Sequence, residues 1–573
     1  MVQNSASENK TLSNAQILTS EYPPSTAKMP YTGNLYSWVV SNPYGVSEEE
    51  VAYYRLDGKA INRRHVQEMA GEIAYFLRHR LGLQRGDRVG IISPNSTLYC
   101  PVVLGILRAG LTCVTLNPIY SSEELLHPLS DSDVKALFVH PVALPTVQKA
   151  FSTLKLSKTL PNGQNRIWIM DDVDWSNPQP TGERDFRPVL EAKELPVETV
   201  SPTEDLAFIV YSSGTSGKPK GVMLTHDNLI AGTDTFMLVN EGEFGPGHTA
   251  VGVLPFFHIF GLNFYTMTTF LIGVHVVVVP RFDINVFCAV VQRFRCSIAM
   301  VVPPMVLALA RHPVVDKYDM STLRVCLCGA APLGPELCDE VQRRLPNVSM
   351  AQGYGLSETS PVLLRAPAKV HRKHPGMAGR IVPHIELRLV AEDGRDVGFE
   401  QGHNGQPGEV WARGRPIMKG YLNNPEATAD CMTPDGWFKT GDVAIVKDGN
   451  FYIVDRTKEL IKYKGFQVSP AELEDHLLGN PNVADCAVVG LYDKGQATEL
   501  PRAYVVPTAS KFNLKSSSPS EKEAFAKSIA DWLNNQVANH KKLRGGVELI
   551  DAIPKSASGK ILRRFLRDRA NGK

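Results

Sequence analysis

The sequence predicts an α/β fold with a large N-terminal domain and a small C-terminal domain, and three observations support this. At 573 residues the chain is too long for one domain. Apolar, β-branched runs alternate with helical patterns over most of its length, which is typical of parallel sheets covered by helices on both faces. From residue 456 onward the pattern changes to the strands and capped helices of a compact α+β domain.

Composition suggests where these parts begin and end. Residues 1–30 are rich in Ser, Asn and Thr, and we expect them to be disordered. Residues 31–454 are expected to form the large domain, with two parallel-type sheets. Within it, short strands punctuated by Gly and Pro indicate a small β-barrel-like subdomain over about 385–454. Residues 456–573 are expected to form the small domain.

Hydrophobic periodicity predicts the elements of the large domain in order. Before residue 157 we expect helices over 61–83 and 101–109, a turn followed by a strand within 86–93, and strands over 111–116 and 134–139. Residues 157–200 are rich in Pro, Asp and Trp and indicate a connecting excursion. After it we expect strands over 206–211, 276–279, 299–302 and 324–328, and helices from His226, over 284–293 and near 306–311.

Two capping boxes predict where helices of the small domain begin. Ser469-Pro-Ala-Glu472 has Pro at the first helical position, and Ser520 stands three residues before Glu523. The second box precedes an apolar face at helical spacing, formed by Phe525, Ile529, Leu533 and Val537. Strands are expected over 483–490 and 503–507.

The composition excludes several classes of function. A net charge of +2 with 43% hydrophobic and 21% charged residues is ordinary for a globular protein and does not indicate a nucleic-acid partner. The nine cysteines show no metal-binding spacing, which favours a reducing compartment. Residues 1–30 lack the apolar segment of a signal peptide, and the chain does not end in Ser-Lys-Leu. We therefore expect a cytoplasmic location.

Residues 259–280 contain no Asp, Glu, Lys or Arg and are long enough to raise the possibility of a membrane span of about 20 residues. Asn263, His275 and several Thr and Gly interrupt the apolar character. The β-branched run over 276–279 is typical of a central strand. We expect a buried helix, a turn and a strand instead of a membrane span.

The rest of the chain is organised around Tyr211-Ser-Ser-Gly-Thr-Ser-Gly-Lys-Pro-Lys-Gly221, which lies between a strand pattern and the helix cap expected at Thr225. Its glycines, hydroxyls and lysines can present donors to an anion, which indicates a phosphate-binding loop. It is not a Walker A loop, because only two residues separate Gly214 from Gly217 and Pro219 follows the first lysine. A Ser/Gly-rich linker is the alternative, but a linker would lack the flanking strand and capped helix.

Together with Gln352-Gly-Tyr-Gly-Leu-Ser-Glu-Thr359, Thr440-Gly-Asp442 and Pro554-Lys-Ser-Ala-Ser-Gly-Lys560, this loop makes the chain resemble the adenylate-forming superfamily. That superfamily includes acyl-CoA synthetases, luciferases and the adenylation domains of peptide synthetases. The resemblance runs from about residue 30 to the C-terminus and is strongest to the coumarate:CoA ligase-like branch. It implies an ATP-dependent acid:CoA ligase that uses Mg²⁺, forms an acyl-adenylate with release of pyrophosphate, and transfers the acyl group to CoA with release of AMP.

The resemblance also implies the residues that bind ATP. The loop would hold the departing phosphates through Ser212, Ser213, Gly214, Thr215, Ser216, Gly217 and Lys220. AMP would contact Gln352, Gly353, Tyr354 and Ser357, with Tyr354 on the adenine, and the ribose would contact Asp442 and Arg456. Glu358 is the implied Mg²⁺ ligand, since Mg²⁺ takes few carboxylates and keeps water and phosphate oxygens as its other ligands.

Lys560 is the implied catalytic cation of adenylation, where its ammonium would offset charge at the α-phosphate. For the second step the resemblance implies domain alternation, in which the small domain rotates about a hinge at Asp455 and withdraws Lys560. That rotation would present Lys462, a second catalytic residue, which together with Lys458 would lie near the acyl-adenylate. The implied CoA contacts are Lys464, Gly465 and Arg281.

The acyl pocket is expected to begin at His258, which would lie beside the carboxylate. Its other candidates are Phe260, Phe264, Met300, Leu327, Ala330, Gly353, Gly355, Pro361, Val362, Lys458 and Lys462. Coumarate ligases usually have Tyr at the position of Phe260, and often Lys and Ser at those of Leu327 and Phe264. Since an apolar pocket does not select for a phenolic hydroxyl, we expect an aryl, cinnamate-like or medium-chain acid.

Three other functions fit parts of the pattern. A stand-alone adenylation enzyme would load a carrier-protein thiol instead of CoA, and a luciferase-like enzyme would oxidise the acyl-adenylate. A non-catalytic nucleotide-binding relative is opposed by the presence of Lys560, Glu358 and Asp442. No carrier or condensation domain is expected downstream, which disfavours a peptide-synthetase module. We expect a monomer or a weak homo-oligomer.

Overall fold

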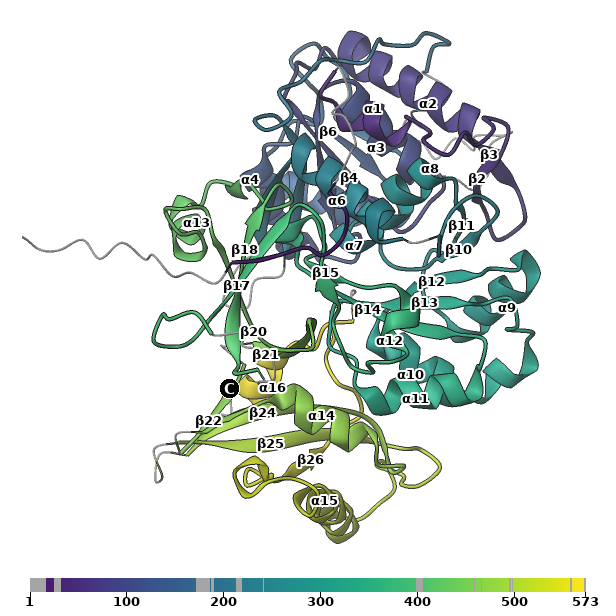
Figure 1. Ribbon diagram of the computed structural model, residues 1–573. Helices are drawn as coiled ribbons and strands as arrows, with labels where there is room; N and C mark the ends of the chain where they lie inside the picture. Colours follow the sequence, from purple (N-terminus) through teal and green to yellow (C-terminus); the bar gives the residue numbers. More distant parts are fainter. Residues whose placement is uncertain are drawn as a thin grey trace, which may run out of the picture.

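Sheets of nine, seven and five strands organise the large domain of the computed structural model, and the small domain lies beside it (Figure 1). The structure describes residues 17–24, 32–171, 186, 190–212, 219–240, 242–397, 405–456, 459–464, 466–493, 496, 498–556 and 559–570. The mixture of parallel sheets, covering helices and a separate α+β domain confirms the predicted fold class.

The seven-stranded sheet has the order β19-β9-β8-β5-β4-β6-β7. Its parallel strands are β4 (Arg88–Ile92), β5 (Thr112–Leu116), β6 (Ala136–Val139), β7 (Ile167–Ile169) and β8 (Leu206–Ser212). Antiparallel strands β9 (Lys220–Thr225) and β19 (Gly420–Tyr421) complete one edge. Strand β7 is a correction, because it lies in the stretch predicted to be only a connecting excursion and is too short to give a strand pattern.

The nine-stranded sheet has the order β16-β15-β14-β13-β12-β10-β11-β2-β3. Its strands are β2 (Val51–Tyr54), β3 (Ala60–Asn62), β10 (Thr249–Gly252), β11 (His275–Val278), β12 (Ile298–Val301), β13 (Val325–Cys328), β14 (Ser349–Tyr354), β15 (Leu364–Arg365) and β16 (Arg380–Ile381). Strand β3 and the helix cap at Asn62 show that the helix predicted over 61–83 begins at α2 (Arg63–Tyr75).

Helices lie over these two sheets (Figure 1). They include α3 (Tyr99–Arg108), α4 (Ser122–Ser132), α5 (Leu144–Thr153), α6 (His226–Val239), α9 (Ile284–Phe294), α10 (Pro303–Arg311) and α11 (Pro335–Arg344). The uncharged stretch forms short helical turns over 259–272, a left-handed Gly273 and then β11. Within the described part of the chain, we find no helix with the length and apolar character that crossing a bilayer requires.

A five-stranded antiparallel sheet stands where the sequence predicts a β-rich subdomain. Its order is β1 (Leu18–Thr19), β17 (Ile385–Val390), β18 (Gly408–Gly414), β20 (Phe438–Lys447) and β21 (Asn450–Arg456), with β1 and β21 at its edges. Strand β1 pairs with β17 through Leu18 and Leu387. The prediction that residues 1–30 are disordered is therefore wrong for this strand, whose pairing partner lies too far along the chain to be recognised.

The small domain packs two helices and a three-stranded sheet around its own apolar core (Figure 1). Its elements are β22 (Ile461–Tyr463), β23 (Phe466–Val468), α14 (Pro470–Leu478), β24 (Val483–Asp493), β25 (Thr498–Pro507), α15 (Pro519–Asn534), β26 (Val547–Leu549) and α16 (Arg563–Ala570). Buried Ile529 and Leu533 confirm the predicted apolar face of α15.

The structure corrects the second predicted helix start and refines the first. Helix α15 is capped by Ser518 and Glu521, because Pro519 takes the first helical position that it favours. The prediction of a box at Ser520 is therefore displaced by two residues. Ser469 caps α14 as predicted, but the Glu472 carboxylate pairs with Lys541 at 2.6 Å.

Helix α14 docks the small domain on helices α10 and α11. The Arg311 guanidinium of α10 donates to the carbonyls of Leu478 and Val483, so it satisfies a carbonyl at the end of α14. On α11 the N-cap is Gly334, and a Cβ there would overlap the Asp475 carboxylate of α14. At this interface Arg311 of the large domain thus binds the end of α14, and Asp475 of the small domain lies against the start of α11.

Gly232 makes a close glycine contact between α6 and the segment after Glu358. We predict that Gly232→Ala lowers the free energy of unfolding by about 1–3 kcal/mol, because its Cβ would lie 2.0 Å from the Ser360 carbonyl oxygen. Helix propensity alone would predict the opposite sign, about 1 kcal/mol of stabilisation. Denaturant unfolding checks this, with Gly245→Ala as the control, since no atom lies within 4 Å of its Cβ. A stabilised Gly232→Ala protein would contradict the packing described here.

Candidate active site

The predicted phosphate loop joins two strands of the seven-stranded sheet. Strands β8 and β9 form an antiparallel hairpin whose last pair is Ser212 and Lys220. Between them, Ser213, Gly214, Thr215, Ser216 and Gly217 lie outside the described residues. The structure therefore fixes the two ends of the loop. His127 is within hydrogen-bond distance of the Pro219 carbonyl, with its Nε2 at 3.0 Å.

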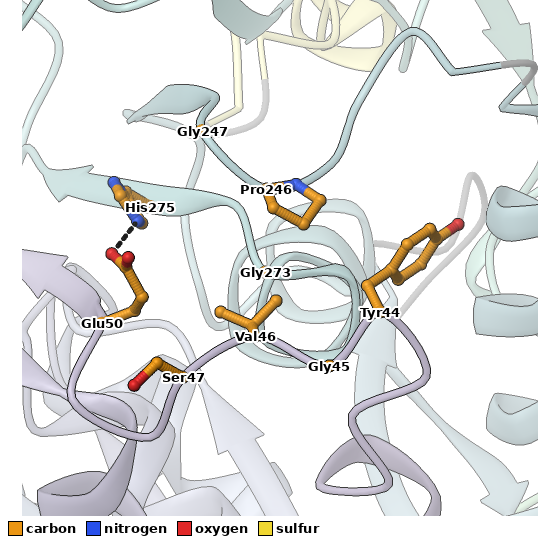
Figure 2. Close-up of a pocket in the computed structure, with 9 residues that line it drawn as sticks. All are labelled: Tyr44, Gly45, Val46, Ser47, Glu50, Pro246, Gly247, Gly273 and His275. Atoms are coloured by element: carbon orange, nitrogen blue, oxygen red, sulfur yellow. Dashed lines mark ion pairs between the residues drawn. The ribbon is translucent and has the colours of Figure 1, made fainter.

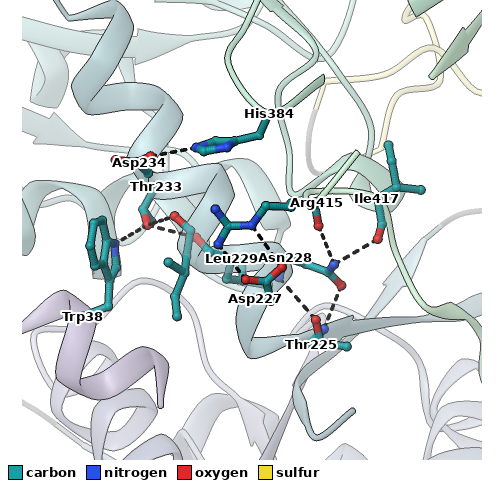
Figure 3. A network of polar contacts seen from close by, with 11 residues as sticks. Trp38, Thr225, Asp227, Asn228, Leu229, Thr233, Asp234, His384, Arg415 and Ile417 are labelled. Atoms are coloured by element: carbon teal, nitrogen blue, oxygen red, sulfur yellow. Dashed lines mark hydrogen bonds and ion pairs between the residues drawn. The ribbon is translucent and has the colours of Figure 1, made fainter. Parts of the chain in front are cut away.

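The helix after the loop begins as predicted. Thr225 and Asn228 form a reciprocal capping box at the start of α6. The Asn228 amide also donates to the carbonyls of Arg415 and Ile417 at 2.7 and 2.9 Å, as Figure 3 shows. These contacts tie α6 to the segment that leads into β19.

Two carboxylates of α6 strengthen the same connection (Figure 3). Asp227 accepts from Arg415 at 2.6 Å. Farther along α6, the buried Asp234 carboxylate lies 2.7 Å from the His384 imidazole, next to β17. Residues on several turns of α6 thus contact the segments next to β17 and β18. These contacts fix the start of α6, which follows the predicted phosphate loop and β9.

Glu358, the predicted metal ligand, lies in a 3₁₀ turn over Ser357–Thr359 and is 8% exposed. Its Oε1 accepts a hydrogen bond of 2.8 Å from the hydroxyl of Tyr421 on β19. Lys220 lies over the ring of the same tyrosine, with its ammonium 4.7 Å from the centroid. Sequence reasoning missed Tyr421, because nothing in the pattern around it indicates a partner 63 residues away.

Asp442, the predicted ribose ligand, is 3% exposed and is held by two side chains. Its Oδ1 accepts from Arg456 at 2.9 Å and its Oδ2 from the Tyr354 hydroxyl at 2.7 Å. Asp442 and Arg456 are cross-strand neighbours in β20 and β21, so the sheet register sets their contact. Three of the predicted nucleotide residues therefore form one unit.

The side chain of Gln352, a predicted AMP contact, bonds to the backbone of Leu333. Its side-chain amide donates to the Leu333 carbonyl at 2.9 Å and accepts from the Leu333 amide at 3.1 Å. These two bonds fix the segment that follows β13. The side chain of Gln352 thus supports a neighbouring loop, and Gly353 follows it on β14.

Lys560 enters this site from the small domain. Burial lowers the pKa of its ammonium to about 8, the nearby Arg456 adds to this, and Glu459, Asp442 and Glu358 oppose it. The Lys560 amide donates to the Ser556 hydroxyl at 3.2 Å, which tightens the turn. Gly559 is left-handed, and a Cβ there would lie 3.0 Å from Val302, so glycine suits this close approach to the large domain.

His258 lies close enough to Lys560 for the two side chains to interact electrostatically. Burial lowers the pKa of its imidazole to about 4, and the positive charge of Lys560 acts in the same direction. The ring is therefore neutral at neutral pH. Its Nδ1 accepts from the Phe260 amide at 3.4 Å, which caps the helical turn over Ile259–Gly261.

Asp455, the predicted hinge, is buried at the junction of the two domains. Its carboxylate accepts from the Ser469 hydroxyl at 2.7 Å and from the Ala471 amide at 3.1 Å, at the start of α14. Nearby, Arg563 pairs with Glu459 at 3.1 Å and with Glu474 at 2.9 Å. The segment that carries Lys560 is thus fixed to the hinge region through Arg563.

The residues predicted for the second step lie elsewhere. Lys462 and Lys464 are exposed on the hairpin formed by β22 and β23, at the outer edge of the small domain (Figure 1). Arg281 is exposed beyond the end of β11. Lys458 and Gly465 lie outside the described residues. The structure brings Lys560 close to Arg456, Asp442 and Glu358, which were predicted to bind the nucleotide and its metal.

The predicted acyl-pocket residues divide into two groups. Phe264 and Met300 have no exposed surface, and Leu327 and Val362 are buried at 2% and 8% exposure. Phe264 packs in an aromatic cluster whose other rings lie 5.2 to 6.1 Å away, those of Tyr265, Phe236 and Phe244. A large polar group at these positions would be buried without a partner.

The second group is less deeply buried. Ala330 is exposed and has a positive φ of 69°. Phe260 contacts Gly329, where a Cβ would lie 2.9 Å from its ring. Gly353 faces Leu327 with ordinary contact distance, whereas a Cβ at Gly355 would overlap the Pro361 carbonyl. There is therefore more space for a ligand beside Gly353 than beside Gly355.

A separate surface pocket of about 380 Å³ lies at the start of β11 (Figure 2). His275 Nε2 lies 3.4 Å from the Glu50 carboxylate in it, and Tyr44 and Pro246 line its other side. Ligands of parallel sheets bind beyond the carboxyl ends of the strands, whereas this pocket lies at the amino end. It contains none of the predicted site residues.

The geometry suits a polyphosphate ligand with a hard cation. Lys560, Arg456 and Lys220 supply positive charge, and Glu358 and Asp442 supply two buried carboxylates. Among the described residues, no group of three His, Cys, Asp or Glu side chains could form a metal cage by itself. A single carboxylate with phosphate oxygens and water is the coordination that Mg²⁺ favours.

Comparison with known proteins gives concordant matches. The AMP-binding enzyme model matches residues 45–422, and the AMP-binding enzyme C-terminal domain matches residues 472–560. The chain is 39% identical to 4-coumarate–CoA ligase 2 of Oryza sativa subsp. japonica, over 85% of this chain and 84% of the relative. It is 37% identical to 4-coumarate–CoA ligase 1 of Arabidopsis thaliana, over 86% and 85%. ATP-bound MatB from Rhodopseudomonas palustris superposes with a TM-score of 0.79 at 25% identity, over 94% of this chain and 98% of that one.

We predict that the Lys560 ammonium titrates with a midpoint near pH 8, because burial and Arg456 disfavour its charged form. The ¹³Cε resonance in lysine-labelled protein reports this, and Lys560→Arg assigns it. Arg456→Gln should raise the midpoint, since it removes the second cause of the shift. A midpoint close to that of free lysine, about 10.4, would show that the small domain does not bury this group.

Proposed function

Since this chain belongs to the AMP-binding enzyme family and is an AMP-forming acid:CoA ligase, we propose that Lys560, Glu358 and Asp442 form the site at which it makes the acyl-adenylate of an apolar acid. ATP and CoA are its substrates with a small carboxylic acid. A carboxylate oxygen attacks the α-phosphorus of ATP, and the bond to the bridging oxygen of pyrophosphate breaks. The CoA sulfur, after losing its proton, then attacks the acyl carbon, and AMP leaves.

The position of Lys560 is the observation that carries the proposal. Its ammonium lies near Arg456, Glu358 and Asp442, although it belongs to the other domain. At this point it can offset the negative charge that the attacking carboxylate and the α-phosphate bring together. Because a pKa of about 8 leaves the ammonium deprotonated at higher pH, adenylation should decline as the pH rises through that value.

The other nucleotide contacts follow from the same unit. Asp442 can accept from the ribose hydroxyls, and Arg456 keeps its carboxylate ionised and oriented through the 2.9 Å bond. Tyr354 hydrogen-bonds to Asp442 and can offer its ring to the adenine. Ser212 and Lys220, with the loop between them, are suited to the departing phosphates. Ser357 and Gly353, the chain neighbours of Glu358 and Tyr354, are proposed as further AMP contacts.

The residues present fit a Mg²⁺ ion at Glu358. Its Oε1 is held by Tyr421, and its Oε2 makes no hydrogen bond to any described residue, so one oxygen is free for a cation. A bound Mg²⁺ would draw negative charge from the phosphate oxygens. The carboxylate supplies one ligand, which leaves positions for phosphate and water.

The acid is proposed to be an aryl, cinnamate-like or medium-chain acid without a phenolic hydroxyl. The relatives named above are 4-coumarate–CoA ligases. The candidate pocket of this chain has Phe260, Leu327 and Phe264, none of which can pair with a phenol. Neutral His258, beside Lys560, is suited to the carboxylate end of the acid.

Transfer to CoA is proposed to use a second orientation of the small domain. Lys462 and Lys464 are exposed on the β22–β23 hairpin, away from Lys560, so one orientation does not bring both sets to the acyl group. Rotation of the small domain about Asp455 would withdraw Lys560 and bring Lys462 and Lys464 toward the acyl group. Lys464 and Gly465, with Arg281, are proposed as CoA contacts, and Lys458 and Lys462 as neighbours of the acyl-adenylate.

AMP release with ATP, Mg²⁺ and a panel of acids, with and without CoA, tests this function. We expect CoA-dependent AMP release that is faster with cinnamate or hexanoate than with 4-coumarate, because no pocket side chain pairs with the phenol. Faster turnover of 4-coumarate would contradict the proposed acid class. Acid-dependent pyrophosphate exchange without turnover of CoA would instead indicate a carrier-protein thiol as the acceptor.

We predict that Phe260→Tyr raises the rate with 4-coumarate relative to cinnamate by about fivefold, the effect of one added hydrogen bond. The ratio of kcat/KM for the two acids measures this. Phe565→Tyr is the matched control, since Phe565 is 56% exposed on α16 and the ratio should not change. An unchanged ratio in Phe260→Tyr would place the ring of the acid away from residue 260.

A further inference from the structure

Three backbone contacts link the segment around Tyr421 to both sides of the proposed triphosphate site. The Met418 amide donates to the Glu358 carbonyl at 2.8 Å. The Leu422 amide donates to the Gly221 carbonyl at 2.8 Å, next to Lys220. Strand β19 also pairs with β9 through Tyr421 and Val222. The segment is therefore fixed against the turn of Glu358 and against the strand that leaves the phosphate loop.

The side chain of Tyr421 contacts the same two sides of the site, Glu358 through its hydroxyl and Lys220 through its ring. Its hydroxyl donates to Glu358 Oε1 at 2.8 Å, and the face of its ring lies 4.7 Å from the Lys220 ammonium. A charge-assisted hydrogen bond orients a carboxylate, and a cation over an aromatic ring is held by the negative face of the ring. At 9% exposure the ring has little freedom to move.

We infer that Tyr421 is a positioning residue that sets the distance between the magnesium ligand Glu358 and the phosphate-binding Lys220. The inference rests on the proposed function, in which Glu358 holds Mg²⁺ and Lys220 contacts the departing phosphates. Because the hydroxyl donates to Oε1 and no described residue bonds to Oε2, Oε2 would be available to a cation. Because the ring supports the ammonium, Lys220 is kept apart from Glu358 and does not neutralise it by direct pairing.

Tyr421→Phe separates the two contacts, since phenylalanine keeps the ring beneath Lys220 and removes the hydroxyl. With Mn²⁺ as the probe and an ATP analogue that cannot release pyrophosphate, we expect metal binding to weaken about 10- to 100-fold. The EPR signal of free Mn²⁺ measures this without turnover. Transfer of the acyl group from supplied acyl-adenylate to CoA should be unchanged, because that step does not involve the triphosphate.

Tyr421→Leu removes the ring as well. Compared with Tyr421→Phe, it should bind the ATP analogue about fivefold more weakly, the effect of one partly buried cation–π contact. Tyr504→Phe is the matched control, because its hydroxyl donates to the Leu566 carbonyl at 3.0 Å within the small domain. This control should bind Mn²⁺ as the wild type does.

Two results would overturn the inference. Unchanged Mn²⁺ affinity in Tyr421→Phe, together with weakened binding in Glu358→Gln, would show that Glu358 needs no support from Tyr421. An equal loss of acyl transfer and of metal binding in Tyr421→Phe would indicate a general structural defect. If Glu358→Gln itself leaves Mn²⁺ binding unchanged, the metal assignment of the proposed function fails, and that outcome is distinct from both.

Discussion

A buried ammonium group, carried by one domain into the site of the other, is the feature on which the rest of this structure depends. The Lys560 side chain is buried where its loop meets the large domain, and the loss of hydration disfavours its charged form. The positive charge of Arg456 disfavours that form further. Glu358, Asp442 and Glu459 offset part of this cost. The site therefore holds a cation that is incompletely neutralised, and a polyphosphate with an incoming carboxylate would complete the neutralisation.

The large domain supplies fixed partners for this cation. Cross-strand register sets Asp442 against Arg456, and β19 sets Tyr421 against both Glu358 and the end of the phosphate loop. Helix α6 is tied to the five-stranded sheet by its cap and its charged pairs. The described contacts of the small domain with the large one include the hinge at Asp455, the contacts of α14 and the approach of Gly559 to Val302.

Much of this could be predicted from the sequence, because the motifs are local. The fold class, the strand and capped helix around the loop, and the elements between residues 206 and 328 follow from periodicity and caps. Strands β1 and β7 could not be predicted, since each is two or three residues long and is defined by a distant partner. Tyr421 was missed for the same reason, and the dual hydrogen bonding of Gln352 to Leu333 depends on packing between β14 and the loop after β13.

Single-turnover kinetics of Lys560→Ala test the central claim most directly, with the two half-reactions measured separately. The account predicts that formation of the acyl-adenylate from acid and ATP slows at least about 100-fold. Transfer from supplied acyl-adenylate to CoA should be retained, and Lys555→Ala, which breaks only the 2.6 Å pair with Asp485, should preserve both steps. Equal losses in the two half-reactions, or undiminished adenylation, would contradict the role given to the buried ammonium.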